Sequence, residues 1–155
     1  MSFRKALLAA MILAGPALGQ CREDRLDIRQ DGLHASFDVE IADDAAERAR
    51  GLMFVEEMGQ LEGMLFVYED EPRQRSFWMR NTLIPLDMLF IDTAGVVRDI
   101  HVGAVPLDET PILSATDDIF AVLEVNGELT TMLGLTEGAE IRHPAFGSEA
   151  AWPCD

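Results

Sequence analysis

Leu33-His34-Ala35-Ser36-Phe37-Asp38-Val39-Glu40-Ile41 is the stretch that decides the expected fold. Apolar side chains occupy every second position, and histidine, serine, aspartate and glutamate occupy the positions between them. A strand shows this period of two when one of its faces packs on a core and the other meets water. The stretch therefore predicts a half-buried β-strand, and the neighbouring segments decide what kind of sheet it joins.

Short elements follow this strand in quick succession. Asp43 or Asp44 offers an N-cap for a helix over 45–50, and Gly51 is placed to end it. Asn126-Gly127 predicts a turn before a short helix over 128–133. Further strands are predicted at 64–68, 76–79, 86–91, 96–102, 112–114, 119–125 and 139–143. The order predicts an α+β fold in a single domain, with a mainly antiparallel, barrel-like sheet and one or two short helices.

The first nineteen residues have the pattern of a secretory signal peptide. Arg4 and Lys5 precede an uncharged apolar run, and small residues lead to a cut before Gln20. We expect residues 1–19 to be removed and residues 20–155 to form the mature domain, periplasmic or secreted, with an irregular tail and no transmembrane helix. A lipid anchor at Cys21 is the alternative, because Leu18-Gly19-Gln20-Cys21 resembles a lipobox in which Gln20 replaces the usual small residue.

The charge balance excludes one class of partner. The 155 residues hold 28 acidic and 12 basic side chains, a formal net charge of −16. Binding to DNA depends on lysine and arginine side chains that neutralise phosphates. We therefore expect no nucleic-acid partner, and an acidic surface suits a neutral or cationic one.

Two cysteines stand at the extreme ends of the mature chain, Cys21 and Cys154. In an exported protein an even pair predicts a disulfide. Two free thiols, or lipidation of Cys21, are the alternatives.

Several motifs resemble those of a known family. They are Gly51-Leu52-Met53, Gly63-Met64-Leu65-Phe66, the block from Phe77 to Asp87 (FWMRNTLIPLD), Leu123-Glu124-Val125 with Gly127, and Gly134 with Gly138. Over residues 26–143 the chain resembles the domain-of-unknown-function family 192 (DUF192). The resemblance implies a small, often exported bacterial or archaeal protein with a compact sheet-rich fold, and no established activity, cofactor or catalytic residue. Val55 departs from the basic residue expected near that position.

Two acidic side chains fall on otherwise apolar strand faces, Asp87 and Glu124. Burial of a lone carboxylate is costly, so such groups are normally paired or protonated. Arg80 is a plausible partner for either, in an ion network that fixes strand register, and on this interpretation Arg80→Ala destabilises the fold. The alternative is a catalytic pair, with one carboxyl as a general acid and Arg80 as the group that orients the substrate.

Trp78 lies two residues before Arg80 and offers a stacking surface for a ligand, but the pattern favours a core or rim tryptophan. Asn81 and Asp87 complete the candidate ligand-binding set. The scattered histidines form no metal-binding motif, the methionines fall in apolar strands, and no nucleophile or phosphate-loop motif is present. We therefore expect no metal and no cofactor.

These observations leave three hypotheses. The first is a non-catalytic binding or accessory module of the cell envelope that takes a small molecule, glycan or protein at the Trp78–Asp87 region. The second is a hydrolase of an envelope polymer with Asp87 and Glu124 as its carboxylates, and the third is a structural factor without a pocket. Whether the chain is an enzyme is left open, although no catalytic motif favours it.

Overall fold

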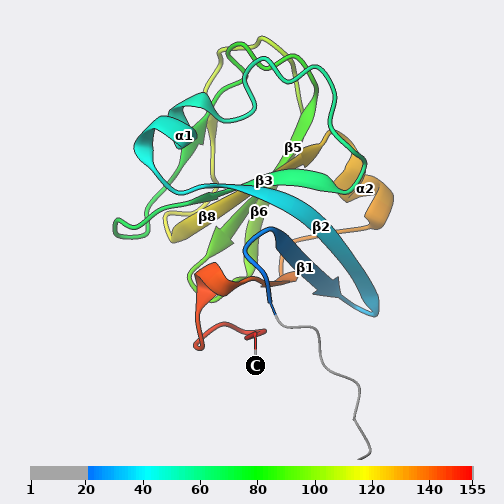
Figure 1. The fold of residues 1–155 in the computed structure, drawn as a ribbon, viewed down its shortest axis with the longest axis vertical. Helices are drawn as coiled ribbons and strands as arrows, with labels where there is room; N and C mark the ends of the chain where they lie inside the picture. The colour runs from blue at the N-terminus through cyan, green and yellow to red at the C-terminus, as the bar shows by residue number, and fades with distance from the viewer. Residues whose placement is uncertain (1–20, 155) are drawn as a thin grey trace, which may run out of the picture.

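The fold was determined from a computed structural model, which describes residues 21–154. The expected signal peptide and its cleavage point before Gln20 lie outside the described residues. Seven strands form one curled sheet in the spatial order β6-β5-β8-β3-β2-β1-β9 (Figure 1). Their bounds are β1 Arg25–Gln30, β2 Leu33–Ala42, β3 Glu62–Val67, β5 Leu86–Asp92, β6 Val97–Ala104, β8 Ile119–Asn126 and β9 Glu140–Arg142.

Most neighbouring strands in this sheet are antiparallel, but β2 and β3 run parallel. A parallel pair cannot be joined by a tight turn and needs a crossover connection. Residues 43–61 supply it and contain α1 (Ala45–Arg50). Asp44 and Glu47 form a capping box at the start of this helix, which satisfies orphan backbone donors at both positions.

The remaining elements are short. Strands β4 (Ser76–Phe77) and β7 (Ile112–Leu113) pair as a separate two-stranded sheet. Helix α2 (Leu129–Leu133) follows β8 directly, and a 3-10 turn, η1 (Pro144–Phe146), follows β9. The α+β class, the barrel-like sheet and the two short helices are confirmed, whereas β1 was not among the expected strands.

Each face of the sheet carries its own apolar core. The inner core draws residues from all seven strands and includes Leu26, Phe37, Leu65, Leu89, Leu123 and Ile141. The sheet curls until its two outermost strands meet, since a bridge joins Val96, beside β6, to Glu140 of β9. The core that draws on all seven strands fills the inside of this curl. The outer core contains Met64, Phe66, Met88, Phe90 and Val122, and loops cover it.

The two ends of the described chain are joined by a disulfide between Cys21 and Cys154, with Cα atoms 5.5 Å apart. The tail before Cys154 has no regular element beyond η1, yet it is well anchored. Trp152 lies over the guanidinium of Arg29, 4.5 Å from ring centroid to Cζ. Figure 1 places this end of the molecule opposite the long loops. The described residues contain no helix long and apolar enough to cross a membrane.

Candidate functional site

Asp87 is completely buried, and N–H and O–H groups of the protein donate hydrogen bonds to both of its carboxylate oxygens. The backbone N–H groups of Gly103 and Glu128 each donate to Oδ1 at 2.8 Å. Thr130 donates twice to Oδ2, from its backbone N–H at 2.9 Å and from its hydroxyl at 2.5 Å. Asp87 therefore joins β5, β6 and the first turn of α2, where orphan N–H groups favour an anionic acceptor.

Glu124 has the opposite surroundings. Its side chain is 4% exposed, and within residues 21–154 no hydrogen bond or ion pair reaches the carboxyl group. Met64 of β3 and Met88 of β5 are its register partners on the two neighbouring strands. Burial without a compensating partner disfavours the charged form and raises the pKa of Glu124 to about 8.

The structure does not bring these two acids together. In the β5–β8 register, Asp87 lies opposite Val125 and Met88 lies opposite Glu124. Because successive side chains of a strand point to opposite faces, Asp87 shares the inner face with Val125, and Glu124 shares the outer face with Met88. The sheet thus lies between the two carboxyl groups. A general acid and a second carboxylate cannot act on one bond from opposite sides of a sheet.

The raised pKa of Glu124 predicts a dependence of stability on pH. The folded state holds this proton up to about pH 8, while the unfolded chain releases it near pH 4.5. The folded state therefore binds more protons between these values, and stability falls as pH rises through this window. From pH 5 to pH 7.5 the wild type should lose about 3 kcal/mol of its free energy of unfolding through this group, and Glu124→Gln should not. The free energy of unfolding of the variant minus that of wild type should therefore rise by about 3 kcal/mol between the two pH values.

Urea unfolding of both proteins at the two pH values measures this difference. Glu137→Gln is the matched control, because Glu137 is exposed. If this difference from wild type rises with pH no more in Glu124→Gln than in Glu137→Gln, the buried carboxyl is ionised in the folded protein and the prediction is wrong.

Arg80 approaches neither acid. Its side chain is 52% exposed, and its nearest carboxylate is that of Glu109, also exposed, at 3.8 Å from Nε to Oε1. The expected strand over 76–79 ends at Phe77, so the residues that follow lie in a loop rather than on a sheet face. The ion network expected around Arg80 is therefore not formed.

Arg80 instead lies beside the indole of Trp78, with Cζ 5.4 Å from the ring centroid. Trp78 is 47% exposed and belongs to neither core. Asn81, half-buried, lies one residue further and takes a positive φ of 55°. Three of the four expected ligand-binding residues thus share one loop, and the fourth, Asp87, is enclosed.

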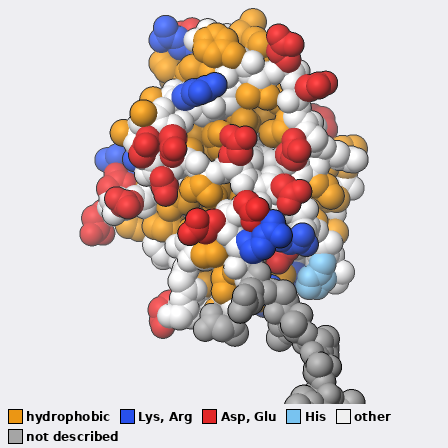
Figure 2. Space-filling model, viewed as in Figure 1, with side chains coloured by type: hydrophobic (Ala, Val, Ile, Leu, Met, Phe, Trp, Pro, Cys, Tyr) orange, Lys and Arg blue, Asp and Glu red, His pale blue; other side chains and the backbone are white. Residues whose placement is uncertain are grey.

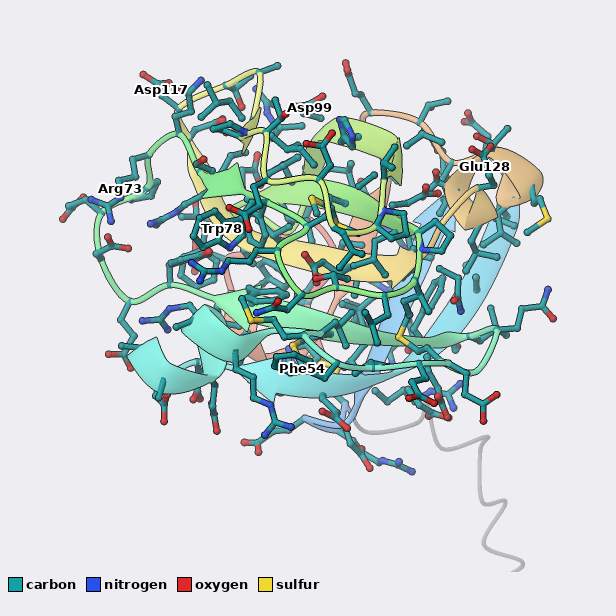
Figure 3. The ribbon with its side chains drawn as sticks, turned by 90° about the horizontal axis from the view of Figure 1, so that it is seen from above. Phe54, Arg73, Trp78, Asp99, Asp117 and Glu128 are labelled. Carbon is teal, nitrogen blue, oxygen red and sulfur yellow. A yellow bond between two sulfur atoms is a disulfide. The ribbon has the colours of Figure 1, made fainter. Side chains whose placement is uncertain are left out.

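Three loops meet at this end of the molecule, and we call their exposed apolar surface the loop platform. Its large apolar side chains are Phe54, Trp78, Leu83 and Leu107. Figure 3 looks onto this end and labels Trp78 and Phe54, with Phe54 on the side of β2. A depression of about 480 Å³ next to the platform is lined by Met79, Val105 and Leu113 among others.

Backbone hydrogen bonds hold the loops of the platform to one another. The N–H of Phe54 donates to the carbonyl of Asn81 at 2.8 Å. The N–H of Leu107 lies 3.1 Å from the carbonyls of both Met79 and Thr82. Phe54 and Leu107 have positive φ values of 66° and 65°, in the left-handed region that bulky residues rarely adopt. This backbone conformation costs each residue about 1 kcal/mol or more. The fold thus keeps two large apolar side chains exposed on strained backbone.

Phe54 and Leu107 were not among the residues predicted from the sequence. Each lies in a loop without a periodic pattern, and a positive φ at phenylalanine or leucine has no sequence signal. Among residues 21–154 no three histidine, cysteine or acidic side chains are grouped closely enough to hold a metal ion.

The fold and these surfaces define a small, disulfide-closed α+β domain with an exposed apolar platform. Residues 26–143 match the model of the DUF192 family, which is described as an uncharacterized ACR. The chain belongs to this family. None of the curated proteins matches the sequence.

Two solved structures are similar to this one. A protein of unknown function from Novosphingobium aromaticivorans DSM 12444 has a TM-score of 0.73 and 37% identity, covering 91% of this chain and 99% of its own. A protein from Sinorhizobium meliloti 1021, provisionally described as a transcription regulator, has a TM-score of 0.74 and 35% identity, covering 79% and 95%.

Proposed function

We propose that this protein is an exported, non-catalytic binding domain of the cell envelope that holds a protein partner on the loop platform. The observation that carries the proposal is the exposure of Phe54, Trp78 and Leu107 on loops joined by hydrogen bonds. Exposed apolar groups gathered in one place mark interaction surfaces, and strained backbone concentrates at functional positions.

A protein partner fits the side chains of the platform better than a sugar does. Tryptophan and arginine are enriched among the residues that dominate protein interfaces, and large apolar side chains form the centre of such interfaces. Arg80 lies beside the Trp78 ring, whereas a sugar needs a free indole surface on which to stack.

Export is supported by two features of the chain. The first nineteen residues have the basic head, apolar run and small-residue exit of a signal peptide. The Cys21–Cys154 disulfide is compatible with an oxidising compartment outside the cytoplasm, where such bonds persist.

Other functions find less support. The hydrolase hypothesis needs Asp87 and Glu124 in one cleft, and their side chains lie on opposite faces of the sheet. The provisional description of one structural neighbour as a transcription regulator is not carried over to this chain, because a net charge of −16 opposes binding to phosphates.

Variants of the platform test this proposal. Arg80→Ala should shift the melting temperature by less than about 2 °C, because its side chain is exposed and surface ion pairs contribute little. Trp78→Ala should lower it by several degrees at most, because roughly half of the indole is exposed. Both should reduce recovery of a co-purifying envelope protein at least about tenfold, since truncation of central interface residues costs more than 1 kcal/mol.

The control for this experiment is Asp31→Ala, an exposed position in the β1–β2 turn, far from the platform in the sheet. Equal recovery of every co-purifying protein by Trp78→Ala and Asp31→Ala would contradict the assignment of the platform as the binding surface.

A further inference from the structure

A cleft of about 850 Å³ lies over the outer face of β2 and β3, separate from the depression beside the platform. The connection that holds α1 forms one wall of the cleft, and the two parallel strands form its floor. Figure 2 shows it as an apolar hollow surrounded by acidic side chains. The apolar part of its lining includes Ile41, Leu52, Met53, Val55, Met58 and Met64.

The rim of the cleft carries an excess of negative charge. Six acidic side chains line it, against the two arginines Arg22 and Arg50. Three of the acids already have partners within the protein. Asp24 pairs with Arg22, Glu47 accepts the backbone N–H groups of Asp43 and Asp44, and Glu62 accepts that of Gly59. Asp38, Glu40 and Glu57 are exposed, and within residues 21–154 their carboxylates make no hydrogen bond or ion pair.

The sheet register adds to this excess. Asp38 of β2 lies directly opposite Glu62 of β3, and both side chains are exposed. Two carboxylates on neighbouring strands repel each other, and a cation placed between them relieves the repulsion. In the next row Glu40 lies opposite Met64, so a carboxylate stands at the edge of the apolar floor.

The size of the cleft fits a small ligand, because sites for small molecules span roughly 300–1,000 Å³. Its lining is mixed: six acidic and two basic side chains lie beside the apolar ones, so a fitting ligand carries both a charged and an apolar part. Methionine side chains adapt to the shape of an apolar body. A second copy of this chain is a poor occupant, because it brings a further net charge of −16 to an acidic rim.

We propose that this cleft binds a small organic cation with an apolar body, of the alkylammonium class. The cationic end lies at the rim beside Asp38 and Glu40, and the alkyl chain lies along the floor formed by Met53, Val55 and Met64. This site adjoins the loop platform, because Met53 and Val55 lie on either side of Phe54 in the chain. The proposal does not rest on the protein partner proposed for the platform.

Calorimetric titration of the oxidised mature protein with n-octylammonium tests the proposal, with ethylammonium and n-octanoate as comparison probes. Ethylammonium carries the charge without the long chain, and n-octanoate carries the chain with the opposite charge. We expect n-octylammonium to bind one site, ethylammonium to bind at least about tenfold more weakly, and n-octanoate not to bind.

The double variant Asp38→Asn/Glu40→Gln should weaken binding of n-octylammonium about tenfold, since each exposed ion pair contributes up to about 1 kcal/mol. The matched control is Glu137→Gln/Glu149→Gln, which makes the same change in net charge at exposed positions that do not line the cleft. Both positions in the cleft variant are exposed, so both double variants are expected to fold.

Equal affinities of the two double variants would overturn the proposal, because they would show general attraction to an acidic protein. Equal affinities for n-octylammonium and ethylammonium would overturn it as well, because the apolar floor would then play no part. The titration of Trp78→Ala should match that of wild type, which separates this site from the loop platform.

Discussion

Asp87→Ala is expected to lower the free energy of unfolding by about 4 kcal/mol, a large fraction of the 5–15 kcal/mol that holds a typical domain folded. The wild-type carboxylate accepts four hydrogen bonds at a fully buried position. Removal of the acceptor leaves buried donors of Gly103, Glu128 and Thr130 without a partner. Each unsatisfied buried donor costs about 1–3 kcal/mol, offset where water enters the space.

Thermal and urea unfolding of purified variants measure this effect. Thr130→Val is the matched comparison, because it removes one of the four bonds and is expected to cost about 1 kcal/mol. A cost for Asp87→Ala no larger than that for Thr130→Val would contradict the role of Asp87 as the anchor of α2. If Asp87→Ala does not fold, Asp87→Asn keeps an acceptor oxygen and should give an intermediate loss.

Removal of the terminal disulfide is expected to have a similar effect. The bond closes a loop with a sequence separation of 133 residues, and the chain-entropy relation gives about 5 kcal/mol for a loop of this length. The double variant Cys21→Ser/Cys154→Ser should therefore unfold at a markedly lower urea concentration than the oxidised protein.

Reduced wild-type protein is the control for this measurement, since it lacks the bond and keeps both sulfur atoms. We expect it to match the double serine variant. If all three proteins (oxidised wild type, reduced wild type and the serine variant) unfold at the same urea midpoint, the disulfide does not stabilise the fold. Contacts of the tail such as Trp152 over Arg29 should persist in all three proteins in the absence of denaturant.

The general form of the sheet could be predicted because its signals are local. The alternation over residues 33–41 predicts β2 (Leu33–Ala42) within one residue at its C-terminal end. Asp44 and Gly51 likewise flank α1 as expected, since capping depends on neighbouring residues. Strand β1 was missed because its sequence, RLDIRQ, alternates over only a few positions before the turn at Asp31-Gly32. The parallel pairing of β2 with β3 depends on the crossover path of residues 43–61, which no local pattern specifies.

The candidate site was harder to predict than the fold. Strand periodicity placed Asp87 and Glu124 on apolar faces, and both are buried. It could not show that these faces are opposite sides of one sheet, because that depends on the register between β5 and β8. Arg80 follows a strand that ends at Phe77, two residues earlier than predicted, so its side chain turns away from both acids. Phe54 and Leu107 are joined to the loop after Trp78 only through backbone hydrogen bonds between segments distant in the sequence, to Asn81 and to Met79 and Thr82.

The most direct test of the proposed binding surface is photo-crosslinking in the native cells from a benzoylphenylalanine residue placed at position 83. Leu83 is exposed on the loop platform, and Glu137, on the connection between α2 and β9, is the control position. We predict a discrete adduct with one envelope protein from position 83, none from position 137, and loss of the adduct when Trp78→Ala is also present. No adduct from position 83, or the same adduct from both positions, would contradict the account.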